Sequence, residues 1–491
     1  MARRLFAGFV AVAIAAVAAL AGEAPKGPNV IFILADDLGW GDTGFMWQRA
    51  RAEGLPRIST PNLDRLAAEG VTLRSHYAGA PVCAPSRASL ITGRIQGECS
   101  LRDNCFDRPF SETNTIGTVM KDAGYATWAV GKWGLAGGGE SGAPVTSHPL
   151  DRGFDYFYGF LDHMAGHTYY HYRGYIRGAY MGITENRSDA TASAEGIYST
   201  DLFTAKAKEL ISRHVSSQSG KPFFLYLAIN TIHGSCQSDD TILCKSPMHV
   251  PGRPYPEEGV VWPLEKEELE LRNTWIDPMY ADLPPMAARY ATAITRFDNA
   301  LGDLMRHLER LGIDGETAIV FTSDNGPADE SGADPRFFSS AGPFDGLKRD
   351  VFEGGMRVPA FIRWKGKAPA GAVDDTPSQI HAWMRFLAEA AQGRYERPSS
   401  LVYTQYEFPW GGGTAAFNEF AHRKGSVRGL QQMVRVGDYV ALRTRMRDGN
   451  AKVRLYNVTE DPFQSNDLAQ DPAQAERLKE LTAILDSRYR K

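Results

Sequence analysis

The chain has 491 residues, of which 43% are hydrophobic, so it can bury a large core. Enzymes of this length often form one extended sheet with an appendage. The 54 basic and 58 acidic side chains leave a formal net charge of −4. Because nucleic-acid binding needs a basic field, this charge excludes nucleic acid as an expected partner.

The first residues predict an export signal. Two arginines at positions 3 and 4 precede an apolar run over residues 5–21, and Ala19-Leu20-Ala21 has the small-residue pattern that signal peptidase prefers. The run is short for a membrane-spanning helix and consists mostly of alanine and valine. We therefore predict a signal peptide over residues 1–21, cleavage near Ala21, a periplasmic or secreted product and no stable membrane insertion. A membrane anchor is the alternative.

Several apolar runs have the length and composition of buried strands, and four of them end in chemically capable residues. These are residues 29–34 before Asp36 and Asp37, 125–130 before Lys132, 222–229 before His233, and 317–322 before Asp324 and Asn325. Helical patterns, such as 60–70 and 290–311, lie between them, which is the layout of a mainly parallel sheet covered by helices. Ligands of open α/β sheets sit beyond the carboxyl ends of the strands, so we expect the four endings to share one crevice.

The remaining segments indicate a division of the chain. Residues 248–263 are rich in proline and glycine and predict a long surface excursion. After about Gly393 the pattern changes to short alternating segments, at 432–436 and 439–443, and then to a charged helix over 472–490. We predict a main α/β domain over residues 22–393 and a smaller α+β subdomain over residues 394–491.

Three carboxylates and one amide at strand ends form a candidate metal site. Asp36, Asp37, Asp324 and Asn325 offer hard oxygen ligands, which suit Ca²⁺, or Mg²⁺, better than zinc. The alternative is that these residues only mark strand-to-turn transitions.

Cys83 opens a segment with the composition of a helix start. Pro85 and Ser86 favour a first helical turn, and Arg87 adds a fixed positive charge one step later. Free backbone N–H groups at a helix N-terminus attract negative charge. The segment therefore predicts an anion site beside Cys83. The alternative is that Cys83 is a small buried apolar side chain.

The other four cysteines form two close pairs, Cys99 with Cys105 and Cys236 with Cys244. In an oxidising compartment each pair could close a small loop, which leaves Cys83 as the odd thiol. Free buried cysteines are the alternative.

The stretch over residues 83–94 resembles the signature of the sulfatase family, Cys-x-Pro-Ser-Arg-x-x-x-x-Thr-Gly-Arg, in which the cysteine is oxidised to formylglycine. The matching positions are Cys83, Pro85, Ser86, Arg87, Thr92, Gly93 and Arg94. Segments 36–42 and 323–326 are similar to the two that hold calcium in the family, and 353–359 is a second family mark. Residues 455–468 resemble the closing strand and turn of sulfatases.

The resemblance implies the fold and the partners of the chain. The expected fold is alkaline phosphatase-like, with a large, mainly parallel mixed sheet sandwiched by helices and a smaller C-terminal α+β subdomain. Cys83 would join Asp36, Asp37, Asp324 and Asn325 around the metal. A formylglycine-generating enzyme would mature the chain, and the substrate would be a sulfate ester, expected on a sulfated carbohydrate.

The resemblance also implies roles for four basic side chains. Lys132 and Lys348 match the two lysines that bind sulfate. His233 matches the histidine that faces the leaving-group oxygen, where it can protonate the departing alkoxide. Arg87 would neutralise the nucleophile and the metal-bound oxygens. In the implied mechanism a hydroxyl of hydrated formylglycine attacks sulfur, and loss of the second hydroxyl proton then expels inorganic sulfate.

The chain departs from the family after Lys132. Many sulfatases read Gly-Lys-Trp-His-Leu-Gly, and that histidine contacts the formylglycine hydroxyl, whereas this chain has Gly134. We expect His148, His163 or His167 to fill the gap or to bind substrate; an ordinary polar loop residue is the alternative for each. The family's usual proline two residues after His233 is also absent.

The sequence also allows three other functions. A phosphomonoester or phosphonate hydrolase of the same superfamily would use the same metal and cations. A non-catalytic binder of sulfated glycans would explain Gly134 and the aromatic stretch 169–172, whose rings could stack on sugars. A cysteine hydrolase using unmodified Cys83 with His233 explains neither the acidic pairs nor the two lysines.

Overall fold

A ten-stranded mixed sheet forms the centre of the computed structural model, which describes residues 27–104, 108–139, 142–235, 246–407, 429–449 and 451–490. The strands are, in spatial order, β13 (Ala372–Asp374), β2 (Val71–Leu73), β12 (Ala360–Arg363), β11 (Thr317–Ser323), β1 (Asn29–Ala35), β10 (Phe223–Ala228), β4 (Ala126–Lys132), β5 (Tyr156–Phe160), β8 (Thr184–Glu185) and β9 (Ser188–Asp189). This arrangement confirms the predicted fold class.

The five central strands, from β11 to β5, are all parallel. The four apolar runs with chemically capable ends correspond to β1, β4, β10 and β11, which are direct neighbours in the sheet. The register pairs Leu34 with both Ala228 and Thr322, so these strands end at the same level. Their carboxyl ends therefore meet at one edge, as the sequence predicts. Antiparallel pairing begins only outside this block, at β12 and β8.

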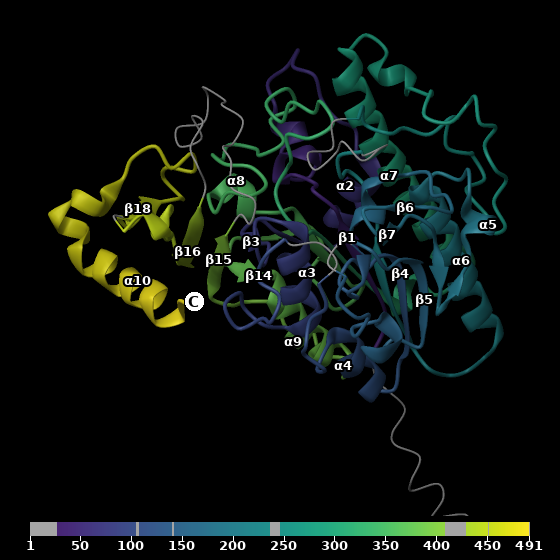
Figure 1. The fold of residues 1–491 in the computed structure, drawn as a ribbon, viewed down its shortest axis with the longest axis horizontal. Coiled ribbons are helices and arrows are strands. Elements are labelled where there is room, and N and C mark those ends of the chain that lie inside the picture. The colour runs from purple at the N-terminus through teal and green to yellow at the C-terminus, as the bar shows by residue number, and fades with distance from the viewer. Residues whose placement is uncertain are drawn as a thin grey trace, which may run out of the picture.

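Helices cover both faces of the sheet (Figure 1). Alternate residues of β1 point to opposite sides: Ile31 and Ile33 pack with α2 (Pro61–Ala68), α6 (Ser199–Ser216) and α7 (Pro285–Arg310), whereas Phe32 packs with α3 (Cys83–Thr92), α4 (Ile116–Asp122) and α9 (Trp383–Ala390). Because both faces are buried, the central strands are apolar throughout instead of alternating with polar residues.

Shorter elements complete the main body. They are β3 (His76–Tyr77) paired with β14 (Ser378–Gln379), the hairpin of β6 (Tyr175–Ile176) and β7 (Ala179–Tyr180), α5 (Thr191–Ala194) and α8 (Glu353–Met356). Residues 246–277 contain no helix or strand, in agreement with the predicted excursion. The helix predicted over 290–311 begins earlier, since Pro285 provides a favourable first-turn residue.

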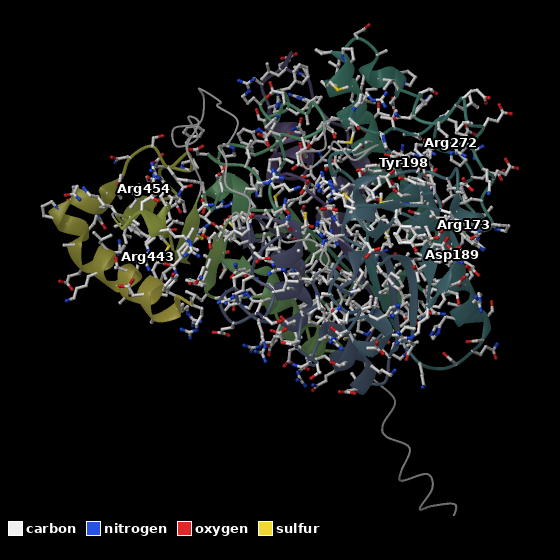
Figure 2. All side chains as sticks on the ribbon, in the orientation of Figure 1. Arg173, Asp189, Tyr198, Arg272, Arg443 and Arg454 are labelled. Carbon is white, nitrogen blue, oxygen red and sulfur yellow. The ribbon has the colours of Figure 1, made fainter. Side chains whose placement is uncertain are left out.

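A separate four-stranded antiparallel sheet follows, with its strands in chain order: β15 (Val402–Glu407), β16 (Leu430–Val436), β17 (Tyr439–Arg443) and β18 (Arg454–Asn457). The helix α10 (Ala475–Arg488) packs on one face of this sheet, at one end of the molecule (Figure 1). Arg443 and Arg454 lie on the sheet (Figure 2), and Arg443 Nη1 is 2.9 Å from Asp486 Oδ1 of α10. The other face packs against residues 351–356 of the main body.

Of the two alternatives for Cys99, pairing with Cys105 or a free buried thiol, the structure shows the second. The thiol of Cys99 is free and buried, since its side chain turns back onto α3, with Sγ 3.6 Å from Ser89 Oγ. The predicted partner Cys105 lies outside the described residues, as do Cys236, Cys244 and the predicted signal peptide over residues 1–21. Across the described ranges, no helix is long and apolar enough to cross a membrane.

Candidate active site

The candidate site lies where β1, β4, β10 and β11 end. The chain beyond β1 stays hydrogen-bonded to its neighbours, because Asp36 N donates to Thr231 O at 3.0 Å and Asp324 N donates to Ala35 O at 3.1 Å. Asp37 has a left-handed backbone, with φ 61°, a conformation that aspartate tolerates better than most residues. The strand ends thereby bring the buried carboxylates of residues 36, 37 and 324 into one place.

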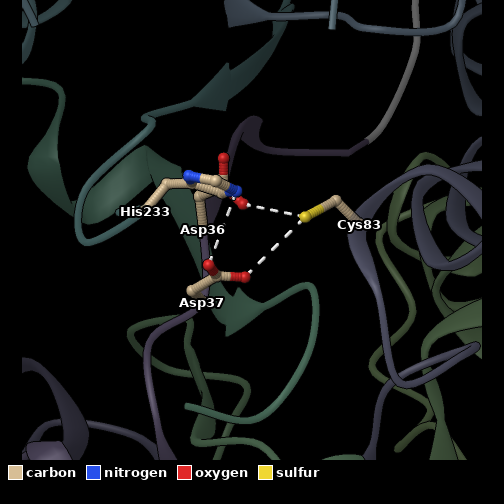
Figure 3. Close-up of side chains that lie close together, drawn as sticks. All are labelled: Asp36, Asp37, Cys83 and His233. Atoms are coloured by element: carbon tan, nitrogen blue, oxygen red, sulfur yellow. Dashed lines mark hydrogen bonds and ion pairs between the residues drawn. The ribbon is translucent and has the colours of Figure 1, made fainter. Parts of the chain in front are cut away.

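Cys83 faces two of these carboxylates from the opposite side. It is the first residue of α3, and its Sγ lies 3.4 Å from Asp36 Oδ1 and 3.7 Å from Asp37 Oδ1 (Figure 3). Burial, together with the Asp36 and Asp324 carboxylates, raises the pKa of the Cys83 thiol well above its ordinary value. The unmodified side chain is therefore held as a thiol, which is a poor nucleophile compared with a thiolate.

Each carboxylate has a cationic partner. Lys132 Nζ is 2.6 Å from Asp36 Oδ2, and Lys348 Nζ is 2.7 Å from Asp37 Oδ2. Arg87 donates to Asp324 Oδ2 from Nε at 2.9 Å and lies 3.5 Å from Asp36. Buried charges are expected to be paired in this way, because the desolvation penalty for an unpaired ion is several kcal/mol.

The pairing affects the three carboxylates differently. Although burial opposes it, Lys132 and Arg87 hold the pKa of Asp36 well below its usual range. Burial outweighs Lys348 at Asp37 and raises the pKa of that carboxyl. Burial and the neighbouring Asp36 raise the pKa of Asp324 to about 7. The protein side chains alone therefore leave two of the three carboxylates incompletely stabilised as anions.

The donor set fits a divalent cation. Ligand atoms of Asp36, Asp37, Cys83 and His233 all lie within 4.8 Å of one another. Asn325 adjoins this group, since its Nδ2 donates to Asp37 Oδ1 at 2.8 Å, while its buried Oδ1 accepts no hydrogen bond from any residue that the structure describes. Asp324 Oδ1 accepts the Asp37 N–H at 3.1 Å. Carboxylate and amide oxygens of this kind suit Ca²⁺ or Mg²⁺.

His233 is positioned by the backbone that follows β10. Its Nδ1 lies 2.9 Å from Gly234 O, which can only accept, so Nδ1 carries the proton and Nε2 accepts from Lys348 Nζ at 3.0 Å. Burial and Lys348 lower the pKa of this imidazole to about 3. Tyr169 supports the segment by donating from its hydroxyl to His233 O at 3.1 Å. The ring is therefore neutral and fixed in orientation.

Two charged residues of the site were not predicted from the sequence. Glu330 Oε2 lies 3.2 Å from Lys348 Nζ and 3.9 Å from His233 Nε2, and its other oxygen pairs with Arg349. All of these side chains are buried or nearly so. The available signals were the position of Glu330 shortly after the Asp324-Asn325 strand end and the position of Arg349 directly after Lys348.

The three histidines considered for the gap at Gly134 lie in different surroundings. The His148 ring packs edge-on against Phe157, and its Nδ1 accepts the Leu150 N–H at 3.2 Å. His167 stacks on His233, with ring centroids 4.0 Å apart and planes 6° apart. His163 lies edge-on to His167 at 5.3 Å and is fully buried. His163 and His167 are thus part of the site's surroundings, whereas the contacts of His148 are local.

Fold and site together define an α/β protein with a buried, charge-paired centre at the carboxyl ends of its parallel strands. The sulfatase family model matches residues 28–393, so the chain belongs to the sulfatase family. It is similar to the N-acetylgalactosamine-6-sulfatase of Mus musculus, with 32% identity over 382 residues, which is 73% of this chain. The alignment spans 62% of that relative, less than two thirds of its length.

Solved structures share the fold. A crystal structure of Ps i-CgsB in complex with k-i-k-neocarrahexaose matches with a TM-score of 0.69 and 24% identity, over 94% of this chain and 92% of that one. The structure of BT4656 in complex with its substrate D-glucosamine-2-N,6-O-disulfate matches with a TM-score of 0.65 and 20% identity, over 94% and 97%. At these identities the likeness defines the fold alone.

Proposed function

We propose that this protein hydrolyses a sulfate ester of a sulfated carbohydrate and releases inorganic sulfate, with a formylglycine made from Cys83 and a bound Ca²⁺. The observation that carries the proposal is the placement of Cys83, which belongs to the signature over residues 83–94. It lies at the head of α3, facing Asp36 and Asp37, whose other oxygens hold Lys132 and Lys348.

The charge distribution suits a sulfate group. The two lysines and Arg87 are buried among carboxylates, each with an exposed fraction of 2% or less. A divalent cation held by Asp36, Asp37, Asp324 and Asn325 would supply positive charge that polarises an oxygen of the reacting group. It would also replace the lysines as counter-charge to Asp36 and Asp37, which leaves Lys132 and Lys348 able to bind sulfate oxygens. Fixed cations in a dry site stabilise developing negative charge strongly.

The remaining side chains have separate tasks. Formylglycine at residue 83 would supply, in its hydrated form, an oxygen nucleophile where the unmodified chain has a high-pKa thiol. His233 faces the centre with Nε2, which accepts a hydrogen bond from Lys348 Nζ at 3.0 Å; as the donor to the leaving alcohol oxygen it would pass on a proton that Nε2 first takes from Lys348. Arg87 holds the Asp324 carboxylate in place through two contacts to the same oxygen.

The relatives and the N-terminal sequence support the proposed substrate class and cellular setting. The relative from Mus musculus is named for a sulfated amino sugar, which supports a carbohydrate sulfate as the substrate. Residues 1–21 are proposed as the export signal, and a formylglycine-generating enzyme as the maturation partner. Residues 22–393 are proposed as the catalytic domain and 394–491 as a C-terminal subdomain.

The proposal is tested by comparing turnover of matched aryl sulfate and aryl phosphate esters, with the enzyme matured by a formylglycine-generating enzyme. We expect faster sulfate hydrolysis, near-complete loss in Lys348→Ala, and unchanged rates in Lys365→Ala, an exposed control paired with Asp314. A preference for phosphate would identify a phosphoesterase. Binding of sulfated oligosaccharides without turnover would identify a non-catalytic binder, and full activity of unmodified Cys83 enzyme would identify a cysteine hydrolase.

A further inference from the structure

The space next to Gly134 is already filled by another residue. Gly134 has a left-handed backbone, with φ 68°, and a Cβ added to it would lie 3.2 Å from His163 Nδ1, 3.5 Å from His163 Cα and 3.7 Å from His163 Cβ. Interiors are close-packed, so a larger side chain at 134 and the His163 imidazole cannot both occupy this space. Gly134 and His163 are therefore structurally linked, because the His163 imidazole occupies the space that a side chain at residue 134 would need.

The pairing of β4 with β5 places His163 there. Beyond the ends of both strands, Trp133 N still donates to Phe160 O at 3.2 Å and Gly134 N donates to Leu161 O at 3.0 Å. The two chains thus run side by side for two more residues, and the next residues of the β5 side turn across Gly134. Asp162 fixes this turn by accepting the Tyr180 N–H at 2.6 Å.

The turn that follows contacts two proposed catalytic side chains. A Cβ added to Gly166 would lie 2.7 Å from Lys132 Cδ, so the backbone at 166 lies directly on the stem of Lys132. His167 stacks on His233 at 4.0 Å. Segment 163–167 therefore covers Gly134, Lys132 and His233 together, and it brings the His163 imidazole into the site from β5 instead of from β4.

His163 provides a buried, neutral imidazole. Its side chain is fully buried, and burial, together with the Lys132 charge, lowers its pKa well below the ordinary value, which keeps the ring neutral. A neutral imidazole nitrogen can accept a proton or a hydrogen bond. His167 stacks face to face on His233, which gives His167 a packing role. Of His163 and His167, His163 is therefore the better placed to accept a proton.

We propose that His163 acts as the base that residue 134 does not supply. The inference rests on the proposed function. In the step that ends the reaction, the proton of the free hydroxyl on residue 83 passes to an imidazole nitrogen of His163. The electron pair of that O–H bond re-forms the aldehyde C=O, and the bond from the same carbon to the sulfate oxygen breaks, with its electron pair leaving on sulfate.

The test moves the histidine from one chain segment to the other. The variants are His163→Ala, His163→Gln, Gly134→His and the double variant His163→Ala/Gly134→His, with His148→Ala as a control at a buried histidine outside the site. Histidine tolerates a left-handed backbone better than most residues, so it is a reasonable substitution at 134. Formylglycine content, thermal unfolding, steady-state turnover and the pre-steady-state burst of aryl alcohol are measured for each protein.

We expect His163→Ala and His163→Gln to lose about 100-fold or more in turnover, the range for loss of a general base. Both should retain wild-type formylglycine content and a rapid burst of alcohol, because only sulfate release is blocked. Mass spectrometry should find the sulfated residue-83 peptide in these variants. Gly134→His alone should be impaired, and the double variant should recover at least part of the loss. His148→Ala should keep wild-type turnover.

The inference is overturned if both His163 variants turn over at rates close to wild type. It is also overturned if they lose the burst in proportion to turnover, or if the double variant, folded and fully matured, is no better than His163→Ala. Failure of the proposed function gives a different result, since the fully matured wild type would then hydrolyse no sulfate ester.

Discussion

At the scale of single residues, each buried carboxylate of the candidate site is paired with a lysine or an arginine. Glu330 is the least expected of these carboxylates, because it belongs to none of the four strand ends and instead holds Lys348 and Arg349. Although burial opposes it, Lys348 and Arg349 keep the pKa of Glu330 well below its usual range. The carboxylate is thus ionised and fixes the lysine beside His233.

Replacing Glu330 by glutamine should weaken both the fold and the reaction. Hydrogen bonds to charged groups contribute about 1.5–3 kcal/mol each, so we expect Glu330→Gln to lower the free energy of unfolding by about that amount. Sulfate-ester turnover should also fall, because Lys348 loses one of the groups that position it. Urea unfolding and initial rates measure the two effects.

Glu309→Gln is the matched control. Glu309 pairs with Arg65 at 3.3 Å on the surface, where such pairs contribute about 1 kcal/mol or less. Equal effects of the two substitutions would contradict the structural importance of Glu330.

The buried carboxyl of Asp42 should make the stability of the fold depend on pH. Asp42 Oδ2 accepts hydrogen bonds from Gly39 N and Tyr290 Oη, both at 2.8 Å, and burial raises its pKa to about 7, against about 3.9 in an unfolded chain. Between these values the folded state keeps a proton that the unfolded state has lost. The carboxyl therefore destabilises the fold increasingly as pH rises, by about 1.4 kcal/mol per pH unit.

Asp42→Asn removes this titration. The stability of wild type relative to Asp42→Asn should fall as pH rises from about 4 to about 7 and then level off. Denaturant unfolding of both proteins across this pH range measures the difference. Parallel pH profiles would show that Asp42 is ionised in the folded protein.

At the scale of elements, the C-terminal sheet supports the segment that carries Lys348. Met433 of β16 packs with Val351, Phe352 and Met356, which follow Lys348 closely in the chain. Gln431 Nε2 also donates to Arg349 O at 2.9 Å. Strand β16 therefore packs behind the segment that follows Lys348 and supports it.

Met433→Ala should destabilise the protein by about 2–5 kcal/mol, the range for truncating a buried large side chain. We also expect lower turnover, because the cavity lies behind the Lys348 segment. Val436→Ala, on the same strand but 38% exposed, is the matched control and should change both quantities little. Destabilisation without any loss of activity in Met433→Ala would separate the small sheet from the site.

The elements also show how far the sequence could predict the site. The four strand ends that form the candidate site were predictable, because long apolar runs followed by Asp, Lys or His have a clear pattern. Glu330 was not, since its loop has no periodicity. The sequence offered His148, His163 and His167 for the gap at Gly134 but could not choose among them, because the approach of His163 to Gly134 depends on the register of β4 and β5, which only the assembled sheet defines. Two-residue strands such as β8 and β9 carry too few positions for any pattern.

At the scale of the whole molecule, the stability of the fold should depend on whether the proposed cation site is occupied. It would bind side chains from the ends of β1 and β11 and from α3, which no single segment brings together. A ligand that binds only the folded state stabilises it by about 2.7 kcal/mol at a concentration 100 times its Kd.

Removing calcium should therefore lower the Tm and abolish turnover, and adding Ca²⁺ back should restore both. Thermal unfolding in EGTA, in Ca²⁺ and in Mg²⁺ alone measures the effect. Asn325→Ala, which removes the buried Oδ1, should reduce the response of Tm to Ca²⁺. A Tm that is identical in EGTA and in Ca²⁺ would contradict the proposed metal site.

The central claim is that Cys83 is the precursor of the nucleophile. Mass spectrometry of the tryptic peptide over residues 75–87, from active protein made in its own host, tests it most directly. We predict the mass of a formylglycine peptide in place of the cysteine peptide, in proportion to specific activity. A fully active preparation in which Cys83 remains an intact thiol would contradict the account.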